Sequence, residues 1–153
     1  MGMELSELDD LYGSTVLEHC RHPRNHDDLQ SPDATARAVN RFCGDEVDLQ
    51  IVLDNGQVSQ IGAQAKGCSI NQATTSLLSE AVNGRDLAEI EARSALFRRM
   101  MGGEALSAAE IEELGALRAL AGVLQFPVRI KCALLSWTAL EDAVKDYLRG
   151  SGG

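Results

Sequence analysis

Hydrophobic positions in this chain change their spacing twice, from a helical period to strict alternation and back again. Over residues 5–21 the apolar side chains recur every three to five positions, which predicts an amphipathic helix with one buried stripe. Pro23 follows this segment and predicts that the helix ends before it. The polar residues 24–32 are typical of a loop.

Alternation dominates the next segment, residues 36–66. Apolar and polar side chains alternate over residues 47–53, which predicts a half-buried strand. Asn55-Gly56 follows and predicts a hairpin turn, because both residues accept a positive φ. The returning strand is expected over residues 58–65, where a slip of the alternation between Val58 and Ile61 indicates a bulge. A preceding strand over residues 36–42 would complete a three-stranded antiparallel meander.

Helical spacing returns at Ile70 and continues to the end of the chain. Ser69 is the expected N-cap of the first of these helices, and Ser107 opens a capping box with Glu110. The pattern predicts helices over residues 70 to about 83, 87–101, 108 to about 121, and 128–148. In the last helix, the expected buried face is Ile130, Leu134, Trp137, Val144 and Leu148. We therefore expect an α+β fold in which a small antiparallel three-stranded β-sheet is covered by α-helices.

Length and charge narrow the classes of protein that this chain can be. Its 153 residues suggest one domain over residues 1–153, with frayed ends at residues 1–4 and 150–153. The net charge of −9 argues against a nucleic-acid partner. No apolar run approaches the roughly 20 residues of a membrane span, and no secretory signal is visible. We expect a cytoplasmic protein, in which thiols serve as ligands or nucleophiles.

Three short motifs each place a thiol in or next to a predicted change of chain direction: Cys43-Gly44-Asp45, Gly67-Cys68-Ser69-Ile70 and Arg129-Ile130-Lys131-Cys132. Three thiols and the carboxylate of Asp45 supply four donors, the number that a tetrahedral zinc ion takes. Cys68 precedes a predicted helix, whose dipole favours a thiolate. The motifs together predict a zinc site with reactive sulfur chemistry.

Each motif also has a simpler interpretation. Taken singly, all three cysteines are typical of buried core residues, and their spacing is not that of paired C-x-x-C zinc knuckles. The metal site therefore depends on their combination. A second site from His19, Cys20 and His22 is disfavoured, because Pro23 interrupts the helix that would hold it. We expect three arginines to lie on a solvated helical face: Arg98, Arg99 and Arg118.

The order Cys-Gly-Asp, Gly-Cys-Ser-Ile and Lys-Cys-Ala-x-Leu-x-Trp resembles the IscU/SufU (NifU N-terminal-like) family of iron–sulfur cluster assembly proteins. Residues 8–12 and 22–25 also look like that family, so the likeness covers nearly the whole chain. Two features resemble the SufU branch. Lys131 stands where scaffold-type IscU proteins have a histidine, and residues 85–106 resemble the SufU insertion. The family's usual proline near the first cysteine is replaced in Asn40-Arg41-Phe42, which predicts a looser loop.

The SufU resemblance implies a zinc-dependent sulfurtransferase. Such a protein accepts persulfide sulfur from a SufS-type cysteine desulfurase and relays it to downstream Suf assembly proteins. Carried over residue by residue, the Zn²⁺ ligands are Cys43, Asp45, Cys68 and Cys132. The resemblance further implies that Cys43 is the sulfur acceptor, and that Arg129 and Lys131 support the site or dock the partner.

Two alternatives stay open. The same four residues could hold a transient [2Fe–2S] cluster, which would make the protein a scaffold for cluster assembly. Zinc could also serve only to tie the sheet to the helices, because structural zinc in small finger peptides contributes on the order of 10–16 kcal/mol of apparent binding energy.

Overall fold

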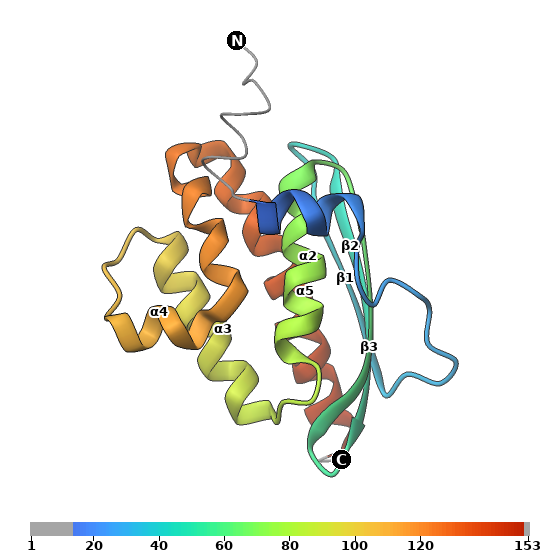
Figure 1. The fold of residues 1–153 in the computed structure, drawn as a ribbon. Helices are drawn as coiled ribbons and strands as arrows, with labels where there is room; N and C mark the ends of the chain where they lie inside the picture. Colours follow the sequence, from blue (N-terminus) through green and yellow to red (C-terminus); the bar gives the residue numbers. More distant parts are fainter. Residues whose placement is uncertain (1–13, 152–153) are drawn as a thin grey trace.

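The computed structural model describes residues 14–151, and side chains up to Arg149. A helix over residues 14–21 is followed by three strands and then by helices only (Figure 1). The predicted part of the first helix over residues 5–13 lies outside the described residues. The further elements are β1 (Ala34–Asn40), β2 (Asp45–Asp54), β3 (Gln57–Lys66), α2 (Ser69–Val82), α3 (Leu87–Met101), α4 (Ala108–Leu114), the 3₁₀ helix η1 (Gly115–Gln125) and α5 (Pro127–Ser151).

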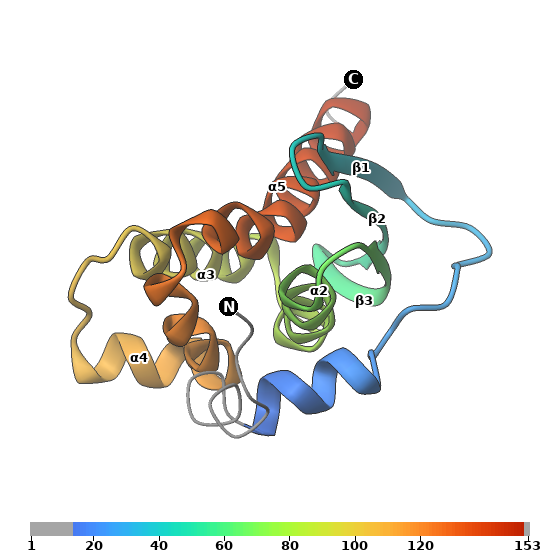
Figure 2. The same ribbon diagram turned by 90° about the horizontal axis from the view of Figure 1, so that it is seen from above.

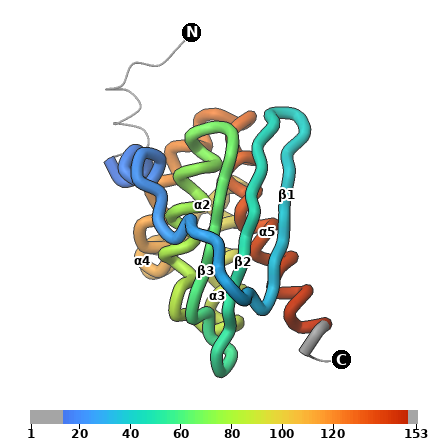
Figure 3. Tube along the Cα trace, turned by 90° about the vertical axis from the view of Figure 1, so that its right-hand side faces the viewer, coloured from blue at the N-terminus to red at the C-terminus, as the bar shows by residue number. Residues whose placement is uncertain are grey.

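The strands form the predicted antiparallel meander in the order β1-β2-β3 (Figure 3). Asn55 and Gly56 have φ of 55° and 78°, as the predicted hairpin turn requires. The predicted bulge is confirmed, because Val52 and Leu53 pair with Gln60 and Val58 and leave the residue between those partners unpaired.

The first strand was predicted two residues too late. It ends at Asn40 and residues 41–44 form a turn, in which the Gly44 N–H donates to the Asn40 carbonyl at 2.8 Å. Gly44 has a φ of 74°, a conformation that glycine adopts without strain. The turn therefore takes Phe42 out of the sheet and presents Cys43 at its end.

Helices α2 and α5 cover one face of the sheet, and α3, α4 and η1 lie beyond them (Figure 1). α2 packs against β3, while α5 packs against β1 and β2. The inward-facing residues of β2, Val47, Leu49 and Ile51, are fully buried beneath these helices. The molecule is thus an α+β fold with a small antiparallel three-stranded sheet covered by α-helices. None of the helices in the described part of the chain is long and apolar enough to cross a membrane.

The helical half differs from the prediction at two places. α3 has the predicted bounds, but the helix predicted to reach residue 121 ends at Leu114. Gly115 has a φ of 58°, which an α-helix cannot continue, and the chain goes on as the 3₁₀ helix η1. In α5, only Trp137 of the predicted buried stripe is fully buried, and Leu148 is exposed. Apart from Trp137, Leu135 and Leu140, the buried side chains of α5 are small: Cys132, Ala133, Ser136, Ala139 and Ala143.

A polar cluster joins α3 to α5 beside these buried side chains. Arg98, predicted to be solvated, instead donates from Nη2 to Glu141 Oε1 at 2.7 Å, and the Ser94 hydroxyl donates to Glu141 Oε2 at 2.6 Å. Burial opposes ionisation, but the hydrogen bonds from Arg98 and Ser94 hold the pKa of the Glu141 carboxyl below its usual value. Nearby, the Phe97 and Trp137 rings stack with centroids 5.2 Å apart.

Replacing Glu141 with Gln should lower the free energy of unfolding by about 1 kcal/mol at pH 7, because both charge-assisted contacts are weakened while a third of each side chain remains exposed. The folded pKa is depressed, so the carboxylate stabilises above the unfolded value of roughly 4.3 and loses that effect as pH falls through the folded value. Urea unfolding at several pH values measures this. The exposed neighbour change Asp142→Asn is the control, and a pH-independent deficit in Glu141→Gln would contradict the assignment.

Candidate metal centre

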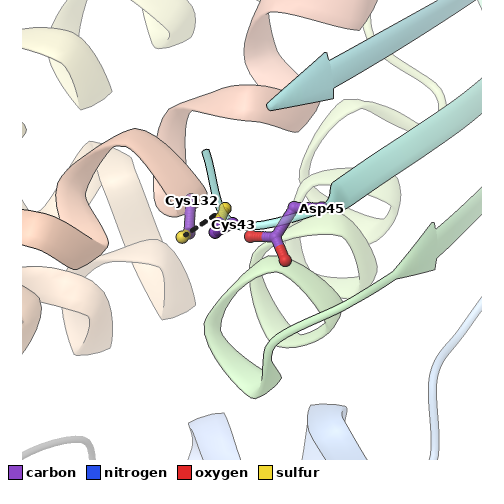
Figure 4. Close-up of side chains that lie close together, drawn as sticks. All are labelled: Cys43, Asp45 and Cys132. Atoms are coloured by element: carbon purple, nitrogen blue, oxygen red, sulfur yellow. Dashed lines mark hydrogen bonds between the residues drawn. The ribbon is translucent and has the colours of Figure 1, made fainter. Parts of the chain in front are cut away.

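Three of the four predicted ligands come together where the turn after β1, the start of β2 and the second turn of α5 meet (Figure 4). The ligand atoms of Cys43, Asp45 and Cys132 all lie within 4.8 Å of one another. The two sulfur atoms are 3.7 Å apart. Cys43 is exposed, whereas Asp45 and Cys132 are buried. The site therefore opens to solvent on the side of Cys43.

Cys68 joins this group through Asp45. Its backbone N–H donates to Asp45 Oδ1 at 2.8 Å, and its thiol lies 3.3 Å from Asp45 Oδ2. The Cys68 sulfur also accepts from the Asn71 N–H at 3.5 Å, so Cys68 is itself the N-cap of α2 in place of the predicted Ser69. A sulfur at this position faces the positive end of the helix dipole, which favours its thiolate form.

Asp45 is completely buried at the centre of the group. Burial opposes its charge, but hydrogen bonds from the Cys132 thiol and from the Cys68 N–H and thiol hold the pKa of the Asp45 carboxyl below its usual value. Conversely, burial and the hydrogen bond to Asp45 raise the pKa of the Cys132 thiol. The Asp45 carboxylate is therefore ionised and the Cys132 thiol is protonated, so the group carries a buried negative charge that a cation can neutralise.

Arg129 and Lys131 lie on different sides of the site. Burial opposes the charge of Arg129, but the sulfurs of Cys68 and Cys132 near its guanidinium raise the pKa of Arg129. The Lys131 ammonium lies instead over the Phe42 ring, 5.6 Å from its centroid. Arg129 therefore contacts the sulfur group, whereas Lys131 faces the exposed surface beside it.

Two residues outside the predicted ligand set hold the site in place. A Cβ added to Gly67 would lie 2.0 Å from Asp45 Oδ1, and Gly67 has a φ of 115°, so glycine alone fits there. The buried Asn71 amide donates to the Glu46 and Lys66 carbonyls at 3.1 and 3.0 Å, which ties the start of α2 to β2 and β3. The sequence motif already contained Gly67, next to Cys68. The role of Asn71 could not be predicted from the sequence, because it depends on tertiary contacts.

The histidines near Cys20 form no second centre with it. His19 is buried, with Nδ1 2.7 Å from the Ser76 hydroxyl and Nε2 3.3 Å from Glu80 Oε1. Burial and Arg24 lower the pKa of His19. Within residues 14–149, the only grouping of candidate metal ligands is Cys43, Asp45 and Cys132.

The donor types fit zinc. Thiolates and a carboxylate are both ligands of Zn²⁺, and thiolates are soft donors that magnesium and calcium avoid. The buried, ionised carboxylate of Asp45 beside three sulfurs also supplies the negative charge that a divalent cation requires.

Comparison with known proteins agrees with the fold and the motifs. The family described as NifU-like N terminal domain matches residues 11–102. The protein named iron-sulfur cluster assembly scaffold protein IscU of Streptococcus pyogenes serotype M1 is 36% identical over 143 residues, which are 94% of this chain and 88% of that protein. The protein named zinc-dependent sulfurtransferase SufU of Bacillus subtilis is 37% identical over 139 residues, which are 91% of this chain and 92% of that protein.

Solved structures have the same architecture. A crystal structure described as a putative iron-sulfur cluster assembly scaffold protein for the SUF system, from Fervidobacterium islandicum AW-1, superposes with a TM-score of 0.80 at 26% identity and covers 88% of this chain and 97% of that one. The N-terminal part of a NifU-like protein from Brucella abortus gives a TM-score of 0.82 at 22% identity, covering 93% and 97%, and agrees in fold. The chain therefore belongs to the NifU-like N-terminal domain family, the IscU/SufU family that its cysteine motifs predicted.

Proposed function

We propose that this protein is a zinc-dependent sulfurtransferase that accepts persulfide sulfur from a SufS-type cysteine desulfurase and relays it to iron–sulfur cluster assembly. The observation that carries the proposal is one exposed thiol, Cys43, in contact with a buried Asp45–Cys132 pair. The Bacillus subtilis relative, named zinc-dependent sulfurtransferase, supports it. A reducing compartment such as the cytoplasm would keep the thiols available.

Four residues would hold zinc: Cys43, Asp45, Cys68 and Cys132. Zinc, when bound, favours thiolate over thiol and carries out no redox chemistry of its own. The chain positions these donors before any metal arrives, because the Cys68 N–H fixes Asp45 and Asn71 fixes the start of α2. Cys43 is exposed, whereas Cys68 is half-buried and Cys132 is buried, so Cys43 is the thiol that a partner protein can reach most readily.

Sulfur acceptance is a thiol–persulfide exchange at Cys43. The Cys43 thiolate attacks the outer sulfur of the desulfurase persulfide, a new S–S bond forms, and the S–S bond of the donor breaks. The desulfurase cysteine leaves as a thiolate that takes up a proton, so the exchange needs neither an oxidant nor a reductant. Cys43 then carries the persulfide at an exposed position, from which the outer sulfur can pass to the next acceptor.

A scaffold function is the second candidate. It is favoured by the Streptococcus pyogenes relative, which is named a scaffold protein and is nearly as similar as the sulfurtransferase. The three sulfurs and Asp45 could take an iron–sulfur cluster as cargo. Against it, the residue before Cys132 is a lysine whose ammonium lies over Phe42 and cannot ligate iron. Stable brown protein with stoichiometric sulfide after anaerobic reconstitution would favour the scaffold.

Changing Cys43 to Ser should abolish stimulation of the cognate desulfurase, because a hydroxyl does not attack a persulfide at neutral pH. Alanine production from cysteine, without added thiol reductant, measures this. The zinc-loaded wild type should raise the rate in a saturable way, and Cys20→Ser, which changes a thiol outside the site, should behave like it. Near-normal stimulation by Cys43→Ser would move the acceptor role to Cys132.

Changing Asp45 to Ala should weaken zinc binding by about 100-fold or more, because it removes one of four ligands and the contact that aims Cys68. Competition with a chromophoric chelator measures the zinc affinity directly. Asp54→Ala removes an exposed carboxylate from the other end of the same strand and serves as control. Unchanged zinc affinity in Asp45→Ala would exclude its ligand role.

Changing Gly67 to Ala should both destabilise the apoprotein and reduce zinc affinity, since the new methyl group would displace the Asp45 carboxylate. Gly84→Ala is the matched control, because Gly84 also has a positive φ, of 83°, but faces open space. The free energy of unfolding of this control should fall by only about 1–2 kcal/mol, the cost of placing an alanine at a positive φ. Thermal unfolding with and without zinc measures both effects. Equal zinc-induced stabilisation of the two variants would contradict the proposed contact.

A further inference from the structure

A shallow groove lies beside the proposed sulfur acceptor, between the end of β1, α5 and α3. Figure 2 shows α5 running alongside β1, with α3 on the other side of α5. The groove has a volume of about 450 Å³ and is largely open to solvent. Its wall includes Phe42, the residue directly before Cys43. An open groove of this shape fits a segment of another protein better than an enclosed small molecule.

The mouth of the groove presents apolar side chains to solvent. Phe42 is 95% exposed and Val39 is 46% exposed, and Leu134 also lines the groove. The position of Phe42 is defined although it is not buried: its N–H donates to Asn40 Oδ1 at 3.1 Å, and the Lys131 ammonium lies over its ring. A nearly fully exposed aromatic ring in an ordered turn is typical of a binding surface, where aromatic side chains supply much of the affinity.

The charge of the groove is opposite to that of the chain. Its wall contains Arg41, Arg98 and Lys131 and no acidic residue, although the whole chain has a net charge of −9. Arg98 is paired with Glu141, whereas Arg41 and Lys131 form no ion pair with any residue that the structure describes. Two uncompensated cations beside apolar side chains favour a partner segment that carries acidic residues around an apolar side chain.

We propose that this groove docks an acidic segment, with an apolar side chain at its centre, of the protein that delivers sulfur to Cys43. This inference rests on the proposed sulfurtransferase function. Phe42 and Cys43 occupy the same turn, so a donor bound at Phe42 has its sulfur close to the acceptor thiol. Arg41 and Lys131 attract the donor at long range, and Phe42 and Val39 exclude water once it has docked.

The test is the dependence of alanine production by the cognate desulfurase on the concentration of zinc-loaded protein. The groove variants are Phe42→Ala, Val39→Glu and Lys131→Glu, and Arg118→Glu makes the same charge change at an exposed position outside the groove. We expect at least a tenfold higher KM for Lys131→Glu and Val39→Glu and about a fivefold higher KM for Phe42→Ala. The kcat at saturation should stay within about twofold of wild type, and Arg118→Glu should retain the wild-type KM. Raising the salt concentration should increase the KM of the wild type more than that of Lys131→Glu.

The zinc content and melting temperature of each variant identify any variant that fails to fold. The three groove variants remove an aromatic ring, place a charge at an apolar position and reverse a charge, so the test does not depend on one variant alone. Unchanged KM in correctly folded groove variants would overturn the docking proposal while leaving sulfur transfer intact. A fall in kcat at an unchanged KM would also overturn it, because the residues would then act on Cys43 itself. No stimulation by the wild type at any concentration would overturn the sulfurtransferase function, and the docking proposal with it.

Discussion

The buried charge of Asp45 is the constraint on which the rest of the site depends. A carboxylate with no exposed surface is unfavourable unless hydrogen bonds or a cation compensate it. Here the compensation comes from Cys68, the N-cap of α2, whose N–H lies 2.8 Å from Asp45 Oδ1, and this approach is possible because Gly67 has no side chain. The contact brings the start of α2 to the start of β2, and with it the sulfur of Cys68 to the group formed by Cys43 and Cys132.

The fold divides the site into a fixed part and an accessible part. Asp45 and Cys132 belong to β2 and α5, and Cys68 caps α2; because α5 packs against both β2 and α2, the core sets the positions of these three residues. Cys43 lies in a turn, exposed, at the end of the edge strand β1. A relay needs this division, because the donors that stay in place must be held rigidly while the thiol that receives sulfur must be reached by another protein.

Local sequence rules predicted much of this arrangement, and tertiary contacts account for what they missed. Three features follow from residues adjacent in sequence and were predicted: the Asn55-Gly56 turn, the bulge opposite Val52 and the bounds of α3. The cysteine motifs indicated which residues would gather, because three thiols and one carboxylate match the donor number and types of a zinc site. The end of α4 at Gly115 was missed, since a glycine inside a helical pattern does not reveal its φ. The Arg98–Glu141 pair was missed because its partners are 43 residues apart.

Sulfur transfer to Cys43 is tested by locating the transferred sulfur atom. The zinc-loaded protein is incubated with the cognate desulfurase and cysteine, alkylated without reduction, digested and examined by tandem mass spectrometry. The proposed acceptor role of Cys43 predicts one added sulfur on the peptide that contains Cys43, and none on the peptides of Cys20, Cys68 and Cys132. Sulfur on Cys132 alone, or no sulfur on any cysteine while the desulfurase is active, would contradict it.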